Sequence, residues 1–216
     1  MKVILICLLG NRDLQIHNDF APSDHPLISR YFVPNNDGRH LIINKSYKAP
    51  FEFKEAAQDV LDHYEEMQDK VIFPMIEASL DYLEEKPDLL ILSTSKQDPV
   101  FSQDCFALAE FADKFYRAKG FETHIDLCPE NPTLMEPMLT YYNQLFDQWD
   151  QPDHQIIVSN SGGTPTMRAA SHFAGLFRGF QFIHVINSRA EDEKPFEEKV
   201  VSSTYQQQEL RILREL

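Results

Sequence analysis

One ten-residue segment carries the clearest pattern for ligand chemistry. Residues 159–168 read SNSGGTPTMR and stand between the apolar run 155–158 and a segment with helical periodicity. The glycine pair allows positive φ and close backbone approach, Thr164 can cap a helix, and Pro165 suits its first position. We therefore expect a strand, a glycine turn and a helix N-terminus whose free N–H groups, on Thr166 and Met167, point at an anion. The alternative interpretation is an ordinary, well-capped strand-to-helix turn.

Two further loops are expected at the same edge of a sheet. The apolar run 2–9 ends at residues 10–13, GNRD, and the run 88–93 leads into residues 93–98, STSKQD. The run 2–9 is expected to be the first strand of a doubly wound sheet, and residues 155–159 the fourth. These two strands flank the switch point of such a sheet, so loops 10–13 and 159–168 should lie side by side there. The third loop adds hydroxyls and a lysine, although a helix-capping loop rich in turn formers explains its composition equally well.

Strands alternate with helices along most of the chain. This order predicts an α/β fold of the Rossmann-like, doubly wound type, with a mainly parallel sheet and helices on both faces. Pro74 should kink or split the first long helix. The expected strands are 2–9, 88–93, 121–127, 155–159, 181–187 and about 199–204, and the expected helices are about 51–84, 102–119, 133–149, 165–177 and 205–216.

Residues 15–50 are too long for a simple strand-to-helix connection. Within them, apolar runs 27–33 and 40–43 flank the turn sequence NNDG at 35–38, which predicts a β-hairpin. We expect this insertion beside the C-terminal end of strand 1, as a lid or a dimerisation arm.

Composition excludes several classes of protein. The net charge is −14, and residues 51–150 hold 22 acidic and 7 basic side chains, so a surface for duplex nucleic acid is not expected. A small anionic ligand remains compatible with this charge, because loops 10–13 and 159–168 carry Arg12 and Arg168.

Cysteine and histidine usage predicts neither disulfides nor a metal site. The three cysteines form no CxxC pair, which favours a reducing cytoplasm, and the eight histidines show no metal-like spacing. No apolar run is long enough to cross a bilayer, and neither a P-loop nor a GxGxxG after strand 1 is present, so no cofactor is expected.

The loops at residues 10–13 and 159–168 resemble those of a known family. The GNRD of residues 10–13 together with SGGTPTM at 161–167 is similar to the CRISPR-associated Rossmann fold (CARF) domain of type III CRISPR defence proteins. The resemblance implies a homodimer whose two switch-point clefts form one pocket for a cyclic oligoadenylate second messenger, cA4 or cA6. Binding in that family allosterically controls an attached effector domain in antiviral defence.

The resemblance and the sheet edge together define the candidate ligand-binding residues. A two-fold symmetric ring suits a two-fold dimer that offers the same donors twice. The candidates are Gly10, Asn11, Arg12 and Asp13 in the first loop; Ser93, Thr94, Ser95 and Lys96 in the second; and Ser161, Gly162, Gly163, Thr164, Pro165, Thr166, Met167 and Arg168 in the third.

Two departures from the family keep other functions open. The 15–50 insertion can alter the pocket, and no effector is recognised after a CARF-like unit spanning residues 1–204, since residues 205–216 suggest only a connector helix. Some family members cleave the ring without metal, for which Arg12, Ser161, Thr164 and Arg168 are candidates, but the third loop contains no lysine. Sensing is therefore favoured, no catalytic residue is assigned, and the alternatives are a ring nuclease or a Rossmann-like domain for another nucleotide.

Overall fold

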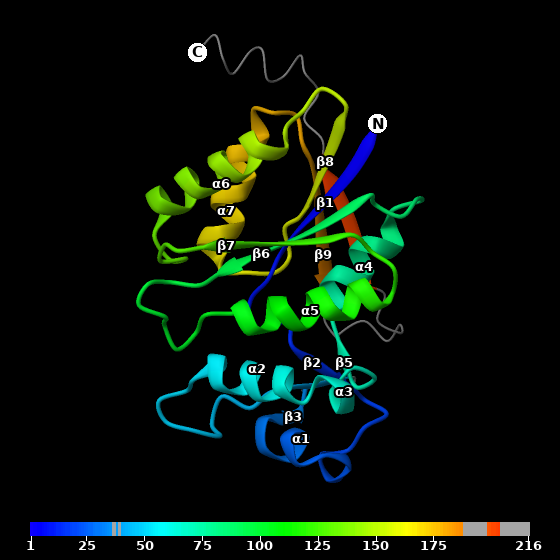
Figure 1. The fold of residues 1–216 in the computed structure, drawn as a ribbon, viewed down its shortest axis with the longest axis vertical. Coiled ribbons are helices and arrows are strands. Elements are labelled where there is room, and N and C mark those ends of the chain that lie inside the picture. The colour runs from blue at the N-terminus through cyan, green and yellow to red at the C-terminus, as the bar shows by residue number, and fades with distance from the viewer. Residues whose placement is uncertain (36–37, 39, 188–197, 204–216) are drawn as a thin grey trace.

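The chain folds around a six-stranded sheet in which five neighbouring strands are parallel. The structure, a computed structural model, describes residues 1–35, 38, 40–187 and 198–203, and its main sheet has the order β10-β9-β8-β1-β6-β7. β10 is antiparallel to β9. The order runs from β1 outward to β7 and restarts on the other side at β8, which confirms the Rossmann-like, doubly wound α/β fold (Figure 1). The strands are β1 (Lys2–Leu8), β6 (Leu89–Ser95), β7 (Thr123–Cys128), β8 (His154–Ser159), β9 (Gln181–Asn187) and β10 (Glu198–Ser203).

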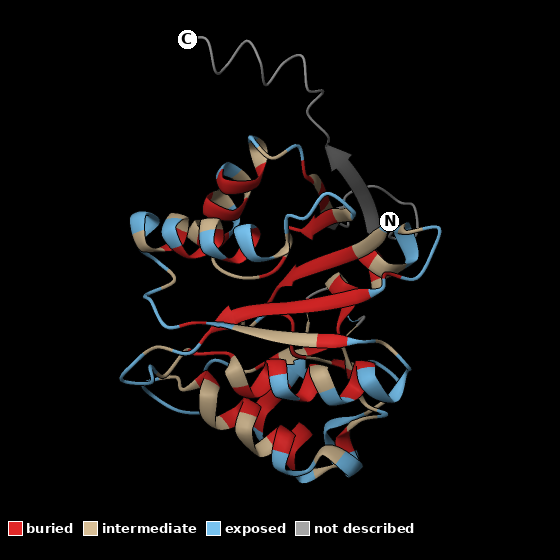
Figure 2. Cartoon of the chain, turned by 45° about the horizontal axis from the view of Figure 1, so that its top comes forward, coloured by how far each residue is buried: buried red, intermediate tan, exposed pale blue. Residues whose placement is uncertain are grey.

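Helices cover both faces of this sheet. α6 (Met135–Trp149) and α7 (Pro165–Leu176) pack on one face, while α4 (Pro74–Tyr82) and α5 (Phe106–Ala118) pack on the other. Successive residues of β1 serve the two faces in turn: Ile4 and Ile6 join the core under α6 and α7, and Leu5 joins the core under α5. Figure 2 shows buried strands between helices whose exposed residues lie on their outer sides, while the edge strand β7 is mostly of intermediate burial. The unbroken apolar runs of the sequence arise because these strands are buried on both faces.

A second, smaller sheet is formed by the insertion and lies beyond α5. Its order is β3-β4-β2-β5, and every pairing in it is antiparallel. The helices α2 and α5 pack together, and the insertion shares one continuous hydrophobic core with α5 and β1 (Figure 1). The elements are β2 (Gln15–His17), a 3-10 turn η1 (Pro22–Asp24), α1 (Pro26–Tyr31), β3 (Phe32–Pro34), β4 (His40–Ile43), α2 (Phe53–Asp62), α3 (Tyr64–Met67) and β5 (Val71–Ile72).

The expected hairpin is present as β3 and β4, but its first strand is much shorter than predicted. Residues 26–31 form α1, so the expectation of a strand over 27–33 was wrong for most of that run. Pro26 occupies the first turn, and the side chain of His25 accepts a hydrogen bond from the N–H of Leu27, which caps the helix start. This apolar run is too short to show a clear period, and the cap at His25 determines that it forms a helix.

The long helix expected over 51–84 was also wrong. The segment contains α2, α3 and α4, with β5 in between. Val71 pairs with Ile16 of β2, and the β-branched residues Val71 and Ile72 suit this antiparallel pairing. Pro74 begins α4 at its first turn, where its missing N–H costs nothing, so the split expected at this proline does occur.

The C-terminal expectations are met only in part within the described residues. The last strand is β10, one residue earlier than predicted at each end, and it pairs with β9 in antiparallel fashion. The predicted connector helix over 205–216 lies outside the described residues.

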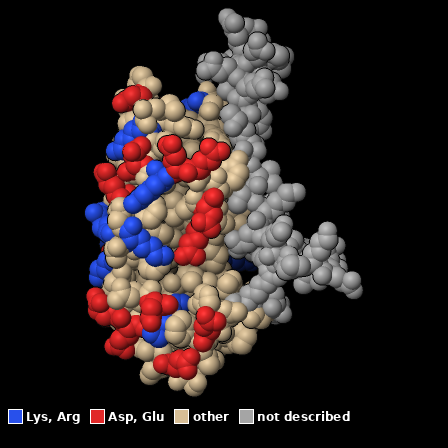
Figure 3. Space-filling view, turned by 90° about the vertical axis from the view of Figure 1, so that its right-hand side faces the viewer, with Lys and Arg blue, Asp and Glu red and all other residues tan. Residues whose placement is uncertain are grey.

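Acidic and basic side chains are interspersed on the face of the molecule drawn in Figure 3. On that face the acidic side chains are divided by cations and do not form one continuous patch. Such mixed surfaces are typical of solvated helix faces.

We predict that Phe73→Ala lowers the free energy of unfolding by about 3–5 kcal/mol, because it removes a fully buried ring from a well-packed core. Phe73 is 0% exposed and its ring packs against those of Phe111, Phe115 and Tyr116. Urea denaturation measures the change. The control is Phe173→Ala, since Phe173 on α7 is 54% exposed and should change the stability by less than about 0.5 kcal/mol. Equal losses in the two variants would contradict the described core.

Candidate functional site

The loops after β1 and β8 meet at the switch point with almost no space between their backbones. A Cβ on Gly162 would lie 1.9 Å from the carbonyl oxygen of Leu8, and a Cβ on Gly10 would lie 3.0 Å from Cα of Gly163. Gly163 also has a φ of 71°, in the region that favours glycine. The glycines of this motif are thus required for one loop to lie against the other, as well as for the turn itself.

Asp13 holds the two loops together from beneath. Its side chain is 2% exposed, and Oδ2 accepts a hydrogen bond of 2.7 Å from the N–H of Gly10. Burial raises the pKa of Asp13 to about 7, although the amides of Gly10 and Gly163 act in the opposite direction. The carboxyl group therefore accepts hydrogen bonds from the loop backbones and does not lie at the surface.

The N-terminus of α7 is capped as the sequence predicts, and the cap also reaches a further loop. Thr164 Oγ1 accepts from the N–H of Met167 at 3.1 Å and donates to the carbonyl oxygen of Pro132 at 2.5 Å. Thr166 Oγ1 donates to Thr133 O at 3.3 Å. The expectation that the Met167 N–H is free for an anion was therefore wrong, because the Thr164 cap uses it.

The residues that precede α7 anchor the motif to its own helix and to β9. Asn160 is 4% exposed, donates through Nδ2 to Arg168 O at 3.0 Å, and accepts from Ser171 Oγ at 3.0 Å. Ser161 Oγ accepts from the N–H of Val185 at 2.6 Å. Polar groups that look like ligand donors in the sequence thus satisfy backbone groups of the fold.

The loop after β6 divides in the same way. Ser93 is buried with its hydroxyl 3.1 Å from Tyr141 OH, and Thr94 is buried with Oγ1 3.4 Å from Leu9 O. Ser95 is also buried but lines a cavity. Lys96 is exposed, and its ammonium group lies 4.8 Å from the centre of the Phe106 ring.

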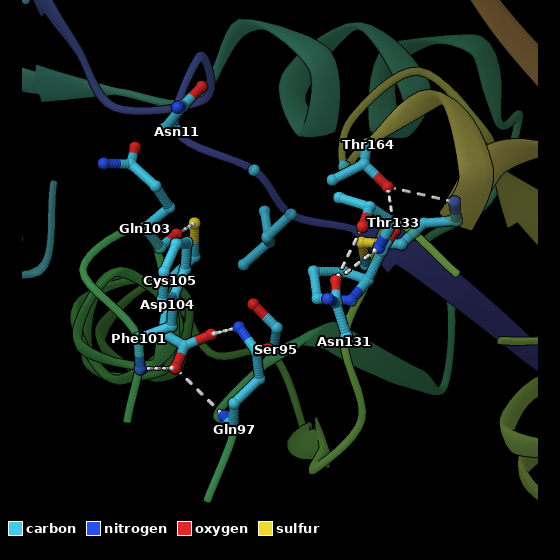
Figure 4. A pocket seen from close by; sticks show the side chains of 15 residues that line it. Asn11, Ser95, Gln97, Phe101, Gln103, Asp104, Cys105, Asn131, Thr133 and Thr164 are labelled. Atoms are coloured by element: carbon cyan, nitrogen blue, oxygen red, sulfur yellow. Dashed lines mark hydrogen bonds between the residues drawn. The ribbon is translucent and has the colours of Figure 1, made fainter. Parts of the chain in front are cut away.

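A cavity of about 420 Å³ opens at the carboxyl edge of the sheet, between the loops that follow β1, β6, β7 and β8. In Figure 4, Gln97, Phe101, Gln103 and Asp104 stand on one side of it and Asn131, Thr133 and Thr164 on the other. Six of the candidate residues line it: Gly10, Asn11, Ser95, Gly163, Thr164 and Met167. The other lining residues are Leu9, Gln97, Phe101, Gln103, Asp104, Cys105, Asn131, Pro132 and Thr133.

Most residues of two cavity walls were not predicted from the sequence. The candidate loop after β6 ended at residue 98, and the β7–α6 loop, which supplies residues 131–133, was not among the candidate loops. The available signal was the topology itself, because the loops after all parallel strands of one sheet open at the same edge.

The remaining candidates do not line the cavity. Asp13, Ser93, Thr94 and Gly162 are buried in the supporting structure, and Ser161 and Thr166 are half-buried. Arg12, Lys96, Pro165 and Arg168 are exposed. No described residue of the 15–50 insertion, nor of residues 51–73 that pack with it, is among the lining residues, so in the described residues the insertion is not a lid on this cavity.

Asp104 organises the β6–α5 wall. It is 0% exposed, and its Oδ2 accepts from the N–H of Gln97 at 3.0 Å and from that of Phe101 at 2.7 Å (Figure 4). Its Oδ1 accepts from Gln97 Nε2 at 3.1 Å. Gln103 Nε2 donates to Phe51 O at 2.7 Å, which ties the same wall to the chain just before α2.

The thiol in the cavity wall is not prepared for nucleophilic chemistry. Cys105 is 4% exposed, and burial, with further contributions from Asp13 and Asp104, raises its pKa far above the ordinary value. The same holds for Cys7 beneath the site, where burial is again the main cause. Both thiols are therefore protonated at neutral pH, and the cavity presents amides, hydroxyls and apolar groups.

In the residues that the structure describes, no three His, Cys, Asp or Glu side chains are grouped as a metal ion would require. No helix there has the length and apolar character to span a membrane.

No family model and no curated protein matches this chain. The interpretation of the site therefore depends on its own geometry.

We predict that Gly162→Ala destabilises the fold by about 3 kcal/mol or more, because a methyl group 1.9 Å from a backbone oxygen forces β1 and the glycine loop apart. Gly179→Ala is the control. Gly179 has a φ of 71° and no atom within 4 Å of the added Cβ, so it should lose only about 1–2 kcal/mol through backbone strain. Thermal or urea unfolding compares the two variants, and a Gly162→Ala protein as stable as the wild type would refute the loop contact.

A pH dependence of stability follows from Asp13. Because its pKa lies above the ordinary 3.8 in the folded state, the folded protein binds a proton that the unfolded chain has lost. This group therefore makes the free energy of unfolding fall as the pH rises from about 4 to about 7, by up to about 1.4 kcal/mol per pH unit.

Asp13→Asn isolates this contribution. The stability of the variant minus that of the wild type should rise between about pH 4 and pH 7 and stay level above about pH 8, as measured by urea denaturation. Glu110→Gln, at an exposed position of α5, is the control, because it removes a carboxyl group that is not buried. A flat difference for Asp13→Asn would contradict the raised pKa.

Proposed function

We propose that this protein is a cytoplasmic sensor of cyclic oligoadenylate that acts as a homodimer and controls an effector in type III CRISPR defence, as a CARF domain does. The observation that carries the proposal is the cavity at the switch point, bounded by loops after β1 and β8 that contain the GNRD and SGGTPTM motifs. Ligands of doubly wound folds bind at this position.

The chemistry of the lining suits a nucleotide more than a simple anion. Carboxamides from three loops face the cavity and offer both donors and acceptors, as the edges of nucleobases require. Exposed cations follow the two motifs, Arg12 in the loop after β1 and Arg168 in the first turn of α7, and in this proposal they meet phosphates that remain outside the cavity. A volume of about 420 Å³ is within the usual range for ligand pockets and suits one nucleoside per protomer.

Large apolar side chains next to the cavity support the dimer in this proposal. Phe101 is 55% exposed, and Leu134 and Met135, at the start of α6, are 52% and 41% exposed. A ring that is shared between two copies would be enclosed by such side chains from both protomers, and closed two-fold symmetry would give each half of the ring identical contacts.

The direct test is isothermal titration calorimetry with cyclic tetraadenylate and cyclic hexaadenylate, with linear tetraadenylate as the control. We expect one ring to bind per two chains, and sedimentation velocity should show a dimer. Mass spectrometry of the ligand after incubation distinguishes a sensor, which returns the ring intact, from a ring nuclease. Absence of heat and of a thermal shift with either ring would overturn the proposal.

Variants of the exposed cations test where the phosphates lie. Arg12→Ala and Arg168→Ala should each weaken binding of the ring by about tenfold or more, since each removes a charge-assisted contact. The control is Arg117→Ala: Arg117 donates to Thr123 O at the start of β7, on the opposite edge of the sheet, and its loss should leave affinity unchanged. Equal effects at all three positions would show that only overall charge matters.

A further inference from the structure

One loop of the cavity wall is also bonded to the chain at the start of α2. Gln103 Nε2 donates to Phe51 O at 2.7 Å, and the N–H of Lys54 donates to Ser102 O at 3.1 Å. The wall and the start of α2 therefore hold each other in place. This loop, residues 96–105, joins β6 to α5 and supplies five of the lining residues: Gln97, Phe101, Gln103, Asp104 and Cys105.

The insertion in turn fixes the position of Phe51. The Phe51 ring meets the ring of Tyr47 edge-on with 5.7 Å between centroids, and the Tyr47 ring meets that of Tyr31, in α1, with 4.8 Å between centroids. Tyr31 is 0% exposed, and the Tyr47 hydroxyl donates to Glu52 O at 2.6 Å. Chains of packed side chains and hydrogen bonds carry energetic coupling between parts of a protein. A continuous set of contacts therefore runs from the core of the insertion to the cavity wall.

Gln103 is the side chain that joins this set of contacts to the cavity. A backbone carbonyl oxygen only accepts hydrogen bonds, so the amide nitrogen of Gln103 is the atom that faces Phe51. The amide group thereby has a fixed orientation, while the same side chain lines the cavity (Figure 4). A ligand that contacts the amide restricts its motion further, and the bond to Phe51 O is then broken less often.

We propose that Gln103 couples the cavity to the insertion, so that a ligand in the cavity orders residues 47–54, and loosening those residues weakens ligand binding in return. A coupling free energy between two sites is reciprocal, so the two effects have the same factor. The net contribution of one neutral hydrogen bond sets that factor at about two- to tenfold. The insertion is then the element that carries the response to the ligand, and the inference rests on the proposed function only for the choice of probe ligand.

The first test needs no ligand. Tyr47→Leu removes the ring contact to Phe51 and the hydrogen bond to Glu52 O, at a position that does not line the cavity. Cys105 lines the cavity and is 4% exposed, so its alkylation by iodoacetamide reports how often the wall opens. We expect the rate at Cys105 to rise by about two- to tenfold relative to the rate at Cys7, measured by peptide mass spectrometry.

The ratio of the two rates separates coupling from a general loss of stability. Cys7 is 1% exposed in the central strand β1, so its alkylation reports unfolding of the main sheet. A variant that is merely less stable raises both rates and leaves the ratio unchanged. Tyr82→Leu is the control variant, since Tyr82 is 40% exposed at the end of α4 and should not change the ratio.

The second test uses hydrogen exchange with and without saturating cyclic tetraadenylate. In the wild type we expect the ring to slow exchange of the amides of residues 47–54 by about two- to tenfold. Gln103→Met should abolish this change, because a thioether cannot donate to Phe51 O. Gln97→Met is the matched control: Gln97 lines the same wall, but its Nε2 donates to Asp104 Oδ1 within the loop, so the response of residues 47–54 should persist.

The outcomes separate this inference from the proposed function. If cyclic tetraadenylate binds but exchange of residues 47–54 is unchanged or faster, the coupling is refuted and the sensor stands. An unchanged ratio of Cys105 to Cys7 alkylation in Tyr47→Leu also refutes the coupling, whether or not a ring binds. If the ratio rises while no ring binds, the link between the insertion and the cavity wall stands and the sensor is refuted.

Discussion

The contact between two loop backbones at the centre of the sheet is the constraint on which the rest of the site depends. Gly162 lies against the carbonyl oxygen of Leu8, and Gly10 lies against Gly163. Only because these four residues fit together can α7 begin where Thr164 reaches the carbonyl oxygen of Pro132. The position of the β7–α6 wall is therefore set by the absence of side chains between β1 and β8.

Asp13 stabilises that contact with a group that is costly to bury. A carboxyl group removed from water is favoured in its neutral form, while backbone amides such as that of Gly10 favour its charged form. A single acid thus links the geometry of the loops to the proton concentration of the solution. The negative charge of Asp13 also raises the pKa of the buried Cys7 and Cys105 thiols, which helps to keep them protonated.

The parts of the fold that were predictable from the sequence are those whose side chains report burial directly. The strands of the main sheet and the helices α5, α6 and α7 were found within a few residues, because long apolar runs and helical periodicity persist where an element is buried on both faces or on one. The strand order followed from the rule for doubly wound sheets. The insertion was less predictable, since α1 and β5 are too short to show a period, and a histidine cap and cross-strand pairing decided their conformation.

The site divides along a similar line. The motif predicted the turn and the cap at Thr164, but it could not show that Asp13 and Gly162 are turned inward or that Arg12 and Arg168 are outside. Those positions depend on which groups satisfy buried amides, and that is decided by tertiary contacts. The β6–α5 wall was invisible for the same reason, because Asp104 acquires its role only when the N–H groups of Gln97 and Phe101 converge on it.

The two sides of the cavity differ in how freely their sequence can change. On the glycine side a Cβ added at position 10 or 162 meets backbone, and Gly163 has a positive φ, so these three positions have almost no room for substitution. On the opposite side Phe101 extends from a loop whose backbone is supported by Asp104, and its side chain is 55% exposed. For a protein engineer, the glycine loops are therefore the part of the site to leave unchanged. A new ligand preference would be sought in residues 97–103, beginning with Phe101.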